Sequence, residues 1–515
     1  MARGAARAGG QVVNRAFDEL RSRLGEVWDL RLTTWLLEWD QEVMMPRGGA
    51  AIRAEQLATI ERVTHERATA DEVGRLLDEL DGYEDELDPE SFEASLIRVA
   101  RRDWEKARRV PTDLQAEMAR AAVDGFELWM TARDTSDYTR FRPAIERNLE
   151  LRRRYVECFD GFDDPYDVLL DDFEPGMKTA EAEAVLLRLR EALIPLAAEI
   201  ADAPQPDSAF LTGPFPVAGQ KRAETELLRR LGFEPTAWRL DEIVHPAAYS
   251  FGTADIRITT RYSEDSLETL FSAMHEFGHG LYEHQIDPAL NRTPLATGVS
   301  LGLHESQSRL WENLVGRSLP FWRGVYPLLA ETFPDVLGAV DLEAFHQAVN
   351  KVEPSLIRVD ADEVTYNLHI VLRFELERAL LDGTLSLDDL PEAWNVRMRE
   401  YLGVEVPDDA HGVLQDVHWS SGAFGYFPTY SLGNVISVQI WGRLKTAVPD
   451  LDDQIEAGEF GNLRAWLRDH LHRFGRMFTP RETLERAVGG PIDPEPYLGY
   501  LRAKAADLYG VAPRA

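Results

Sequence analysis

Apolar residues recur at helical spacing along most of this 515-residue chain, and this periodicity limits its fold more than any other feature. The stretches "LRSRLGEVWDLRLTTWLLEW" (20–39) and "AEAVLLRLREALIPLAAEI" (182–200) are two clear cases. The breaks between such stretches fall where acidic and turn-forming residues gather, as in "DGYEDELDPE", "DGFDDPYD", "DAPQPDS" and "DGTLSLDDLPE". None of these breaks is long enough to separate independent domains. The pattern therefore predicts one mainly helical body.

One stretch, "ADIRITTRY" (254–262), departs from helical spacing. Its β-branched residues alternate with charged ones, which is typical of a strand. A segment with helical spacing follows, and Ser266 stands where a residue that caps this helix would be. We therefore expect a small sheet beside this helix.

The chain carries a formal net charge of −33, from 89 acidic and 56 basic residues. A protein that binds nucleic acid needs a basic face, so the acidic excess argues against a nucleic-acid partner. It also opposes binding to anionic membranes. Only 6 of the basic residues are Lys. Such a composition is typical of proteins adapted to a salt-rich cytoplasm, although a GC-rich genome also favours Arg over Lys.

The sequence also indicates a cellular compartment. Cys158 is the single cysteine, so no disulfide forms within the chain and no oxidising compartment is implied. The N-terminal "MARGAARAGGQVVNRAF" contains arginines but lacks the apolar stretch of a secretory signal. No run approaches the roughly 18 apolar residues that a membrane-spanning helix needs. We therefore expect a soluble, cytoplasmic protein.

The helical segment "ETLFSAMHEFGHGLYEHQ" (268–285) contains His275, Glu276 and His279 in an H-E-x-x-H pattern. Residues four apart lie one turn apart on the same helix face, so both imidazoles can reach one metal ion. Glu276 adjoins the first imidazole, where it can contact a water molecule on the metal instead of the metal itself. This pattern is a metalloprotease signature. The alternative is a solvated helix face with a few polar residues.

A catalytic zinc ion needs a third protein ligand and an open fourth position. Glu305 lies 26 residues beyond His279 in "GVSLGLHESQSRLWENL", which also has helical spacing. A second helix packed alongside the first would bring its carboxylate to the metal. Because most helical glutamates are simply exposed, the residues alone do not decide whether Glu305 is a metal ligand or an exposed side chain.

Two further stretches hold polar residues among apolar ones. In "IRVDADEVTYNLHI" (357–370) and "HGVLQDVHWSSGAFGYFPTYSLGN" (411–434) these residues are Arg358, Asp360, Asp362, Glu363, Gln415, Asp416, His418, Tyr426 and Tyr430. Buried polar groups need partners, so each cluster is either a satisfied network in the core or part of a site.

The motifs occur in the order in which a known family has them. Through "LLEWDQEVMMPRGGAAIRAEQLATI", "DIRITTR", "HEFGH", "HESQ", "IRVDADEVTYNLHI" and "GVLQDVHW", the chain resembles the carboxypeptidase Taq family of metallocarboxypeptidases over nearly its whole length. The resemblance implies a mainly α, clefted helical body of the neurolysin and angiotensin-converting-enzyme type, with a small β-sheet beside the active-site helix. It also implies a single domain over residues 1–515, with two helical lobes around the cleft, and a homodimer.

The resemblance implies an activity and a ligand set as well. It implies one Zn²⁺ or Co²⁺ ion per chain, held by residues matching His275, His279 and Glu305, with Glu276 as the general base. The implied reaction releases single amino acids from peptide C-termini with broad specificity. An endo-acting oligopeptidase with the same metal site is the alternative. A helical scaffold with a relic site would have lost Glu276 or a ligand, and none is missing.

Other residues acquire expected roles from the same resemblance. By position relative to related clefted peptidases, His418 and Tyr430 are expected to donate hydrogen bonds to the tetrahedral oxyanion, with Tyr426 in reserve. Gln415 is expected to contact the substrate. The family commonly has His-Pro-Phe where this chain has His245, Pro246 and Ala247, at the substrate end of the cleft. The preferred peptide length is therefore open.

An exopeptidase must recognise a free carboxylate, and the guanidinium fork matches its two oxygens. Two arginines stand in matching motifs, Arg358 and Arg257. We expect Arg358 to bind the carboxylate and Arg257 to shape the nearby subsites. The alternative partner of Arg257 is Asp255, because strand alternation turns both to one face. The alternative partner of Arg358 is Asp360 or Asp362.

Overall fold

The computed structural model describes residues 2–511 of the chain, with side chains from residue 15 onward. The chain divides into two compact units, each assembled from three stretches of sequence. The first unit contains the chain up to Arg109, then Pro214–Val299 and Ala457–Gly489. The second contains Val110–Gly213, Ser300–Glu456 and the chain from Gly490 onward. One domain with two lobes around a cleft stays a prediction.

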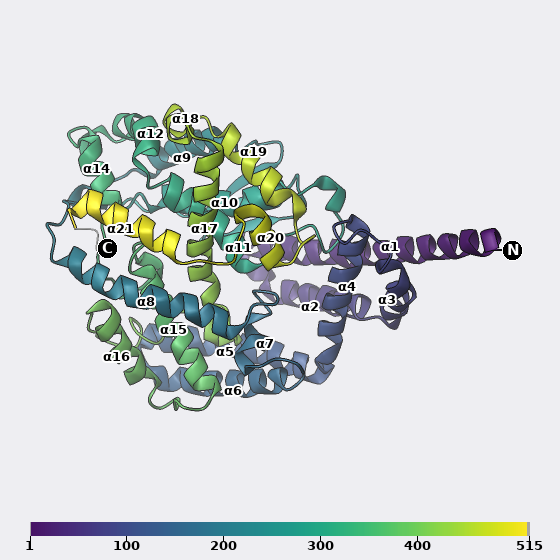
Figure 1. Cartoon of the computed structure of the whole chain (residues 1–515). Coiled ribbons are helices and arrows are strands. Elements are labelled where there is room, and N and C mark those ends of the chain that lie inside the picture. The colour runs from purple at the N-terminus through teal and green to yellow at the C-terminus, as the bar shows by residue number, and fades with distance from the viewer. Residues whose placement is uncertain (1, 512–515) are drawn as a thin grey trace. The chain divides into compact units, whose positions relative to one another are not determined.

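The first unit is mostly helical (Figure 1). Its helices are α1 (Ala2–Val43), α2 (Ala50–Ala68), α3 (Asp71–Glu84), α4 (Phe92–Arg109), α9 (Val217–Leu231), α10 (Glu268–His284), α19 (Gly461–His470) and α20 (Pro480–Val488). Apolar side chains at helical spacing on α3, such as Val73, Leu76 and Leu80, are buried. They form one core cluster with Leu20 of α1 and Ile97 of α4, so the local periodicity and the packing agree.

A three-stranded sheet also belongs to the first unit. Its strands are β1 (Trp238–Glu242), β2 (Ala248–Ser250) and β3 (Ile256–Thr260), in the spatial order β1-β3-β2. The central strand β3 is parallel to β1 and antiparallel to β2, and Arg257 on β3 lies opposite Tyr249 on β2. β3 is the strand that the alternation in "ADIRITTRY" predicts.

Helix α10 packs closely on this sheet, and Gly280 makes the close approach possible. A Cβ atom at Gly280 would lie 2.6 Å from the ring of Trp238 on β1 and 2.8 Å from Ile256 on β3. One turn earlier, the ring of Phe277 stacks on that of Trp238, with the centroids 5.3 Å apart. These contacts fix the rotation of α10 about its axis, and so the direction of its polar face.

The second unit is mainly helical, but two longer stretches, 350–365 and 403–427, are irregular apart from the 3₁₀ turns Arg358–Asp360 and His418–Ser421. Its helices are α5 (Thr112–Thr135), α6 (Tyr138–Val156), α7 (Pro165–Leu170), α8 (Thr179–Ala201), α11 (Leu301–Arg309), α12 (Leu319–Thr332), α13 (Pro334–Leu337), α14 (Leu342–Val349), α15 (Tyr366–Leu381), α16 (Leu390–Leu402), α17 (Pro428–Ala447), α18 (Leu451–Ala457), which ends one residue beyond the unit, and α21 (Glu495–Tyr509). A π-helical segment, η4 (Leu310–Val315), continues α11 directly. Such segments often occur near functional sites.

These elements confirm the prediction of a mainly helical protein with a small sheet beside the motif helix.

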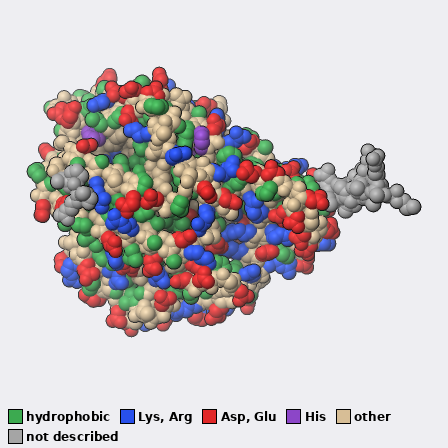
Figure 2. Space-filling view, in the orientation of Figure 1, with side chains coloured by type: hydrophobic (Ala, Val, Ile, Leu, Met, Phe, Trp, Pro, Cys, Tyr) green, Lys and Arg blue, Asp and Glu red, His purple; other side chains and the backbone are tan. Residues whose placement is uncertain are grey.

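Acidic and basic side chains are interspersed over the face drawn in Figure 2. Across the part of the chain that the structure describes, no helix is both long enough and apolar enough to cross a bilayer.

Candidate active site

Helix α10 carries His275, Glu276 and His279. At its start, Ser266 Oγ accepts a hydrogen bond of 2.9 Å from the Glu268 N–H, which satisfies one of the donors left open at a helix end. The two imidazole rings meet edge to face with centroids 4.8 Å apart, as residues one turn apart allow. Both histidines are partly exposed, whereas Glu276 is 7% exposed.

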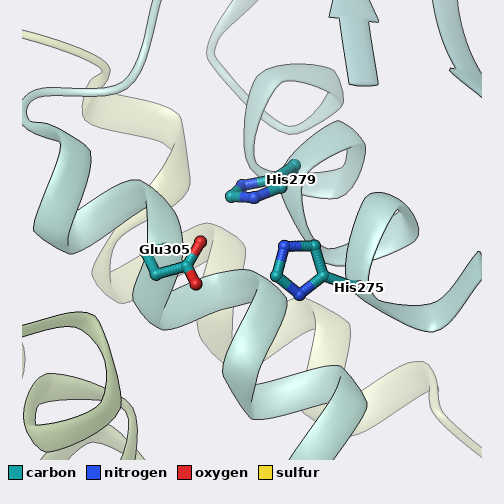
Figure 3. Close-up of side chains that lie close together, drawn as sticks. All are labelled: His275, His279 and Glu305. Carbon is teal, nitrogen blue, oxygen red and sulfur yellow. The ribbon is translucent and has the colours of Figure 1, made fainter. Parts of the chain in front are cut away.

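A carboxylate lies close to the two imidazoles. One ligand atom each from His275, His279 and Glu305 lies within 4.8 Å of the others, and Figure 3 shows the three side chains turned toward one another. A tetrahedral ion with bonds of about 2.1 Å holds its ligand atoms about 3.4 Å apart, so shifts below about 1 Å per side chain suffice. Two imidazole nitrogens and a carboxylate oxygen are a donor set that suits zinc. The residues present therefore fit a catalytic metal ion.

The Glu305 carboxylate is held by neighbours in its own segment. Arg309 Nε donates to Oε1 at 2.7 Å, and the Ser308 hydroxyl donates to Oε2 at 3.1 Å. The Arg309 guanidinium also pairs with Glu312 at 3.1 Å and lies 4.6 Å from the centroid of the Tyr366 ring. These contacts limit the directions in which the Glu305 carboxylate can point.

Tyr249 on β2 lies near Glu276, and the sequence patterns do not single it out. Its hydroxyl donates to Glu42 Oε2 at 2.9 Å. Burial, and then the charges of Glu42, Glu38 and Glu276, raise the pKa of Tyr249 well above its usual value. The hydroxyl therefore stays protonated at neutral pH and can donate a hydrogen bond. One feature could have drawn attention to Tyr249, namely its position on a strand next to the predicted strand.

Arg257 and His245 lie in and beside the sheet. The Arg257 guanidinium forms two hydrogen bonds of 2.9 Å with Asp255, the alternative partner that strand alternation indicates. His245 is exposed in the connection between β1 and β2. Ala247 follows it, and its N–H donates to Thr259 Oγ1 on β3 at 2.7 Å. The His245 segment is therefore tied to the central strand.

Asp416 is the centre of a buried charge cluster in the second unit. Arg358 donates to it from Nε at 2.9 Å and from Nη2 at 2.8 Å, and Arg373 on α15 donates from Nε at 2.6 Å. Gln415 Oε1 accepts from the Arg358 backbone N–H and from Arg373, and Arg358 Nη1 bonds to the Tyr366 hydroxyl at 3.0 Å. Burial alone would raise the pKa of Asp416, but the two guanidiniums hold it well below its usual range. The cluster is a satisfied network with one more positive than negative charge.

Asp362 was one of the two alternative partners for Arg358, and its hydrogen bonds run elsewhere. Its carboxylate accepts from the Thr365 hydroxyl at 2.7 Å and from the Val364 N–H at 2.8 Å. It therefore orders the turn that begins α15. The ion pair that Arg358 does form, with Asp416, joins two motifs that are far apart in the sequence.

His418 and Tyr430 adjoin this cluster. His418 Nε2 lies 3.1 Å from the Tyr430 hydroxyl, and the Tyr426 ring lies 5.1 Å from the His418 ring and 5.3 Å from the Tyr430 ring, between centroids. Burial lowers the pKa of His418 to about 4; the charge of Asp416 opposes this shift, and the two arginines of the cluster add to it. Burial likewise raises the pKa of Tyr430 well above its usual value. At neutral pH the imidazole is therefore uncharged and the phenol protonated, so the pair can offer a hydrogen-bond donor.

Sequence reasoning missed a polar stripe on α15. His369, Arg373 and Glu377 recur every four residues, and each is fully buried. Glu377 accepts hydrogen bonds from Trp419 Nε1 at 2.8 Å and from the Gly425 N–H at 3.0 Å, so it anchors the segment after His418. Burial raises the pKa of Glu377 to about 7, against the effect of its hydrogen-bond donors. The sequence signal that could have revealed this stripe is the occurrence of charged residues at helical spacing inside an apolar run.

The site and the fold together define a class of protein. Two histidines one turn apart, with a buried glutamate beside them and a third ligand nearby, are the arrangement of a metallopeptidase. The chain belongs more narrowly to the carboxypeptidase Taq (M32) metallopeptidase family, whose sequence model matches residues 19–505. The predicted family is thereby confirmed.

Named relatives agree over nearly the full chain. Thermostable carboxypeptidase 1 of Thermus thermophilus is 43% identical over 486 residues, which cover 92% of this chain and 95% of that protein. Carboxypeptidase 1 of Bacillus subtilis is 36% identical over 476 residues, with the same two coverages of 92% and 95%. The crystal structure of an M32 carboxypeptidase from Deinococcus radiodurans has a TM-score of 0.93 at 40% identity, covering 96% of this chain and 100% of that one.

A structure of Pyrococcus furiosus carboxypeptidase has a TM-score of 0.92 at 35% identity, covering 95% of this chain and 98% of that one. This chain is therefore a metallocarboxypeptidase, a hydrolase whose family uses a metal ion. The particular ion and the roles of single residues stay predictions.

Proposed function

We propose that this metallocarboxypeptidase releases single amino acids from free peptide C-termini, with broad specificity, using a zinc or cobalt ion held by His275, His279 and Glu305. One observation carries this proposal: the ligand atoms of these three side chains lie within 4.8 Å of one another. The neighbouring Glu276 supplies a carboxylate on the same helix. We further expect one ion per chain and a homodimer in the cytoplasm.

The reaction divides between the ion and the side chains. A bound divalent ion supplies Lewis acidity, which lowers the pKa of water and polarises the scissile carbonyl. Glu276 takes the proton of the attacking water and later delivers it to the leaving amine. This role needs a base that is fixed beside the ligands, and a position next to His275 on a packed helix provides that.

The tetrahedral oxyanion needs hydrogen-bond donors besides the ion. We assign this role to His418 and Tyr430, with Tyr426 as the alternative donor. The hydrogen bond between His418 and Tyr430 supports the assignment, because it fixes both groups before substrate arrives. The mutual hydrogen bond uses one of the two protons of the neutral imidazole and the phenol, so the pair keeps one donor for the oxyanion over the physiological pH range.

The substrate carboxylate requires a cationic partner, and we assign it to Arg358. Three of the five N–H groups of this guanidinium bond to Asp416 and Tyr366, which leaves one N–H on each Nη for a carboxylate. The extra positive charge of the cluster favours an anion there. Arg257 shapes the neighbouring subsites, with His245 and Gln415 as further substrate contacts.

The alternative is an endo-acting oligopeptidase with the same metal site, and one peptide in two forms separates the two. The protein is purified without added metal, analysed for its elements, and incubated with a peptide as the free acid and as the C-terminal amide. We expect mass spectra to show stepwise loss of single C-terminal residues from the free acid and little cleavage of the amide. Chelation should stop the reaction and zinc or cobalt should restore it. Internal cleavage of both forms would favour the oligopeptidase.

A further inference from the structure

Glu305 lies against a glycine on the neighbouring helix α17. A Cβ atom at Gly433 would lie 2.5 Å from Glu305 Cγ, 2.6 Å from its Cβ and 3.1 Å from its carbonyl carbon. Real Cβ atoms essentially never lie below 3.0 Å from such atoms, and Glu305 Cβ and Cγ are the inner atoms of the side chain, which cannot move away without the backbone of α11. α11 and α17 therefore approach more closely at this point than any other residue at 433 would allow. The space that Gly433 leaves open is occupied by the Glu305 side chain.

The start of α11 is fixed as well, because each of its first four backbone N–H groups has an acceptor. Leu301 donates to the Phe173 carbonyl at 3.0 Å, and Leu303 and His304 donate to the side chain and carbonyl of Ser300 at 3.2 and 3.0 Å. The remaining group, the Gly302 N–H, donates to the carboxylate of Glu174. A helix whose first turn is satisfied in this way has little freedom to slide or fray.

Glu174 provides that remaining acceptor. Glu174 is 2% exposed, and its carboxylate accepts a hydrogen bond from the Gly302 N–H. A Cβ atom at Gly302 would lie 2.8 Å from Glu174 Oε1, so the carboxylate sits directly against the helix backbone. Gly302 precedes Glu305 by one turn, so this contact fixes the same face of α11 that carries Glu305.

We infer that Gly433 and Glu174 are positioning residues for the third metal ligand, an inference that rests on the ligand role proposed for Glu305. Gly433 sets how far the Glu305 side chain stands from α17, and Glu174 sets where α11 begins. Neither residue touches the metal. Both act by holding one carboxylate at the spacing that a metal ion requires, because supporting contacts of ligands strongly affect metal affinity.

Helix α17 itself offers a matched control for a test. Gly442 lies on the same helix, and a Cβ atom there would have no atom within 4 Å. Gly433→Ala and Gly442→Ala are therefore the same substitution in the same helix with opposite surroundings. We expect Gly433→Ala to weaken zinc binding by about tenfold to a hundredfold, measured by competition with a chromogenic chelator. Gly442→Ala should bind zinc like the wild type, because its Cβ atom meets no neighbour, and it should not destabilise the helix, because alanine is the better helix former.

Three comparisons decide the outcome. If Gly433→Ala lowers the unfolding temperature of the metal-free protein but keeps the wild-type zinc dissociation constant, the residue is only structural and the inference is overturned. Glu305→Ala, measured in parallel, tests the ligand role by itself. If Glu305→Ala binds zinc normally, the proposed ligand set fails. If Glu305→Ala loses zinc but Gly433→Ala does not, the positioning role alone fails.

A second pair of variants decides the matter if Gly433→Ala does not fold. Glu174→Ala removes the acceptor for the Gly302 N–H and should weaken zinc binding by about tenfold. Glu174→Gln keeps a side-chain carbonyl as an acceptor and should restore most of the affinity. Equal zinc affinity in Glu174→Ala, Glu174→Gln and the wild type would overturn the inference.

Discussion

The histidine pair on α10 and the charge cluster around Asp416 are both polar groups in a mainly helical protein, yet they are built differently. His275 and His279 are four residues apart, so one helix places them together. Arg358 and Asp416 are 58 residues apart, and only the folded second unit brings them to 2.8 Å. The histidines are partly exposed, whereas Arg358 is 6% exposed and Arg373 is completely buried.

This difference teaches what each region contributes. In the Asp416 cluster, one carboxylate offsets two buried guanidiniums, so the removal of Asp416 leaves two positive charges buried without a counter-charge. The two histidine ligands direct a lone pair at an ion, and the removal of His275 or His279 weakens metal binding but strands no buried charge. Substitutions in the two regions should therefore separate catalysis from stability.

The largest effect on catalysis is expected at Glu276. Glu276→Gln should retain the metal, because Glu276 is not a ligand, but it should lose a factor of at least about a hundred in kcat through the loss of the general base. Elemental analysis and peptide hydrolysis on the same sample measure both quantities. His279→Ala is the control, since it should lose metal and activity together. Hydrolysis by Glu276→Gln at nearly the wild-type rate would show that the base is another group.

Asp416→Asn tests the stability side of the comparison. It keeps the shape of the side chain but leaves Arg358 and Arg373 without their counter-charge, so the free energy of unfolding should fall by about 3–5 kcal/mol. Denaturant unfolding of the metal-free protein measures this loss. Asp255→Asn is the matched control, because its pair with Arg257 is more exposed and should cost below about 1 kcal/mol. His275→Ala should change the same quantity by less than about 1 kcal/mol, and a loss as large as that of Asp416→Asn would break the comparison.

The pH dependence of stability should carry the signature of His418. Its pKa falls from 6.5 to about 4 on folding, so between these values the unfolded chain binds a proton that the folded chain does not. Stability therefore falls as the pH falls through this window, by up to about 3 kcal/mol from this group. His418→Gln should show a shallower loss between pH 6.5 and 4 in denaturant unfolding. A variant with the slope of the wild type would place the acid sensitivity elsewhere.

The smallest of these effects is expected for recognition of the substrate carboxylate. Loss of a charged hydrogen bond typically costs about 1.5–3 kcal/mol, so Arg358→Ala should lower kcat/KM on free-acid peptides by roughly tenfold to a hundredfold. Amidated peptides, already poor substrates, should change little. Arg257→Ala provides the comparison at the other arginine. If Arg257→Ala shows the selective loss and Arg358→Ala does not, the carboxylate binds in the first unit and Arg358 belongs to the stability cluster alone.

Much of the fold follows from local patterns in the sequence. Helical spacing on α3 or α8 and alternation on β3 are set by residues within a few positions of one another, so they can be read without a structure. The strands β1 and β2 have no such pattern, because β2 has only three residues and both strands are mostly only partly buried. The histidine pair is as legible as the helices, since its geometry is that of one turn.

The sequence by itself determined the helical class, the central strand, the family and the two-histidine motif, because each depends on short-range spacing or on the order of motifs. Only the tertiary structure decided the partners of the buried charges. Arg358 pairs with Asp416 and not with Asp362, and Arg373 completes the pair from the middle of an apolar helix. The same holds for the glycine that makes room for Glu305, since no residue pattern near Gly433 in the sequence predicts its contact with α11. Such contacts join residues far apart in the chain, and their energies depend on burial and distance, which no local pattern records.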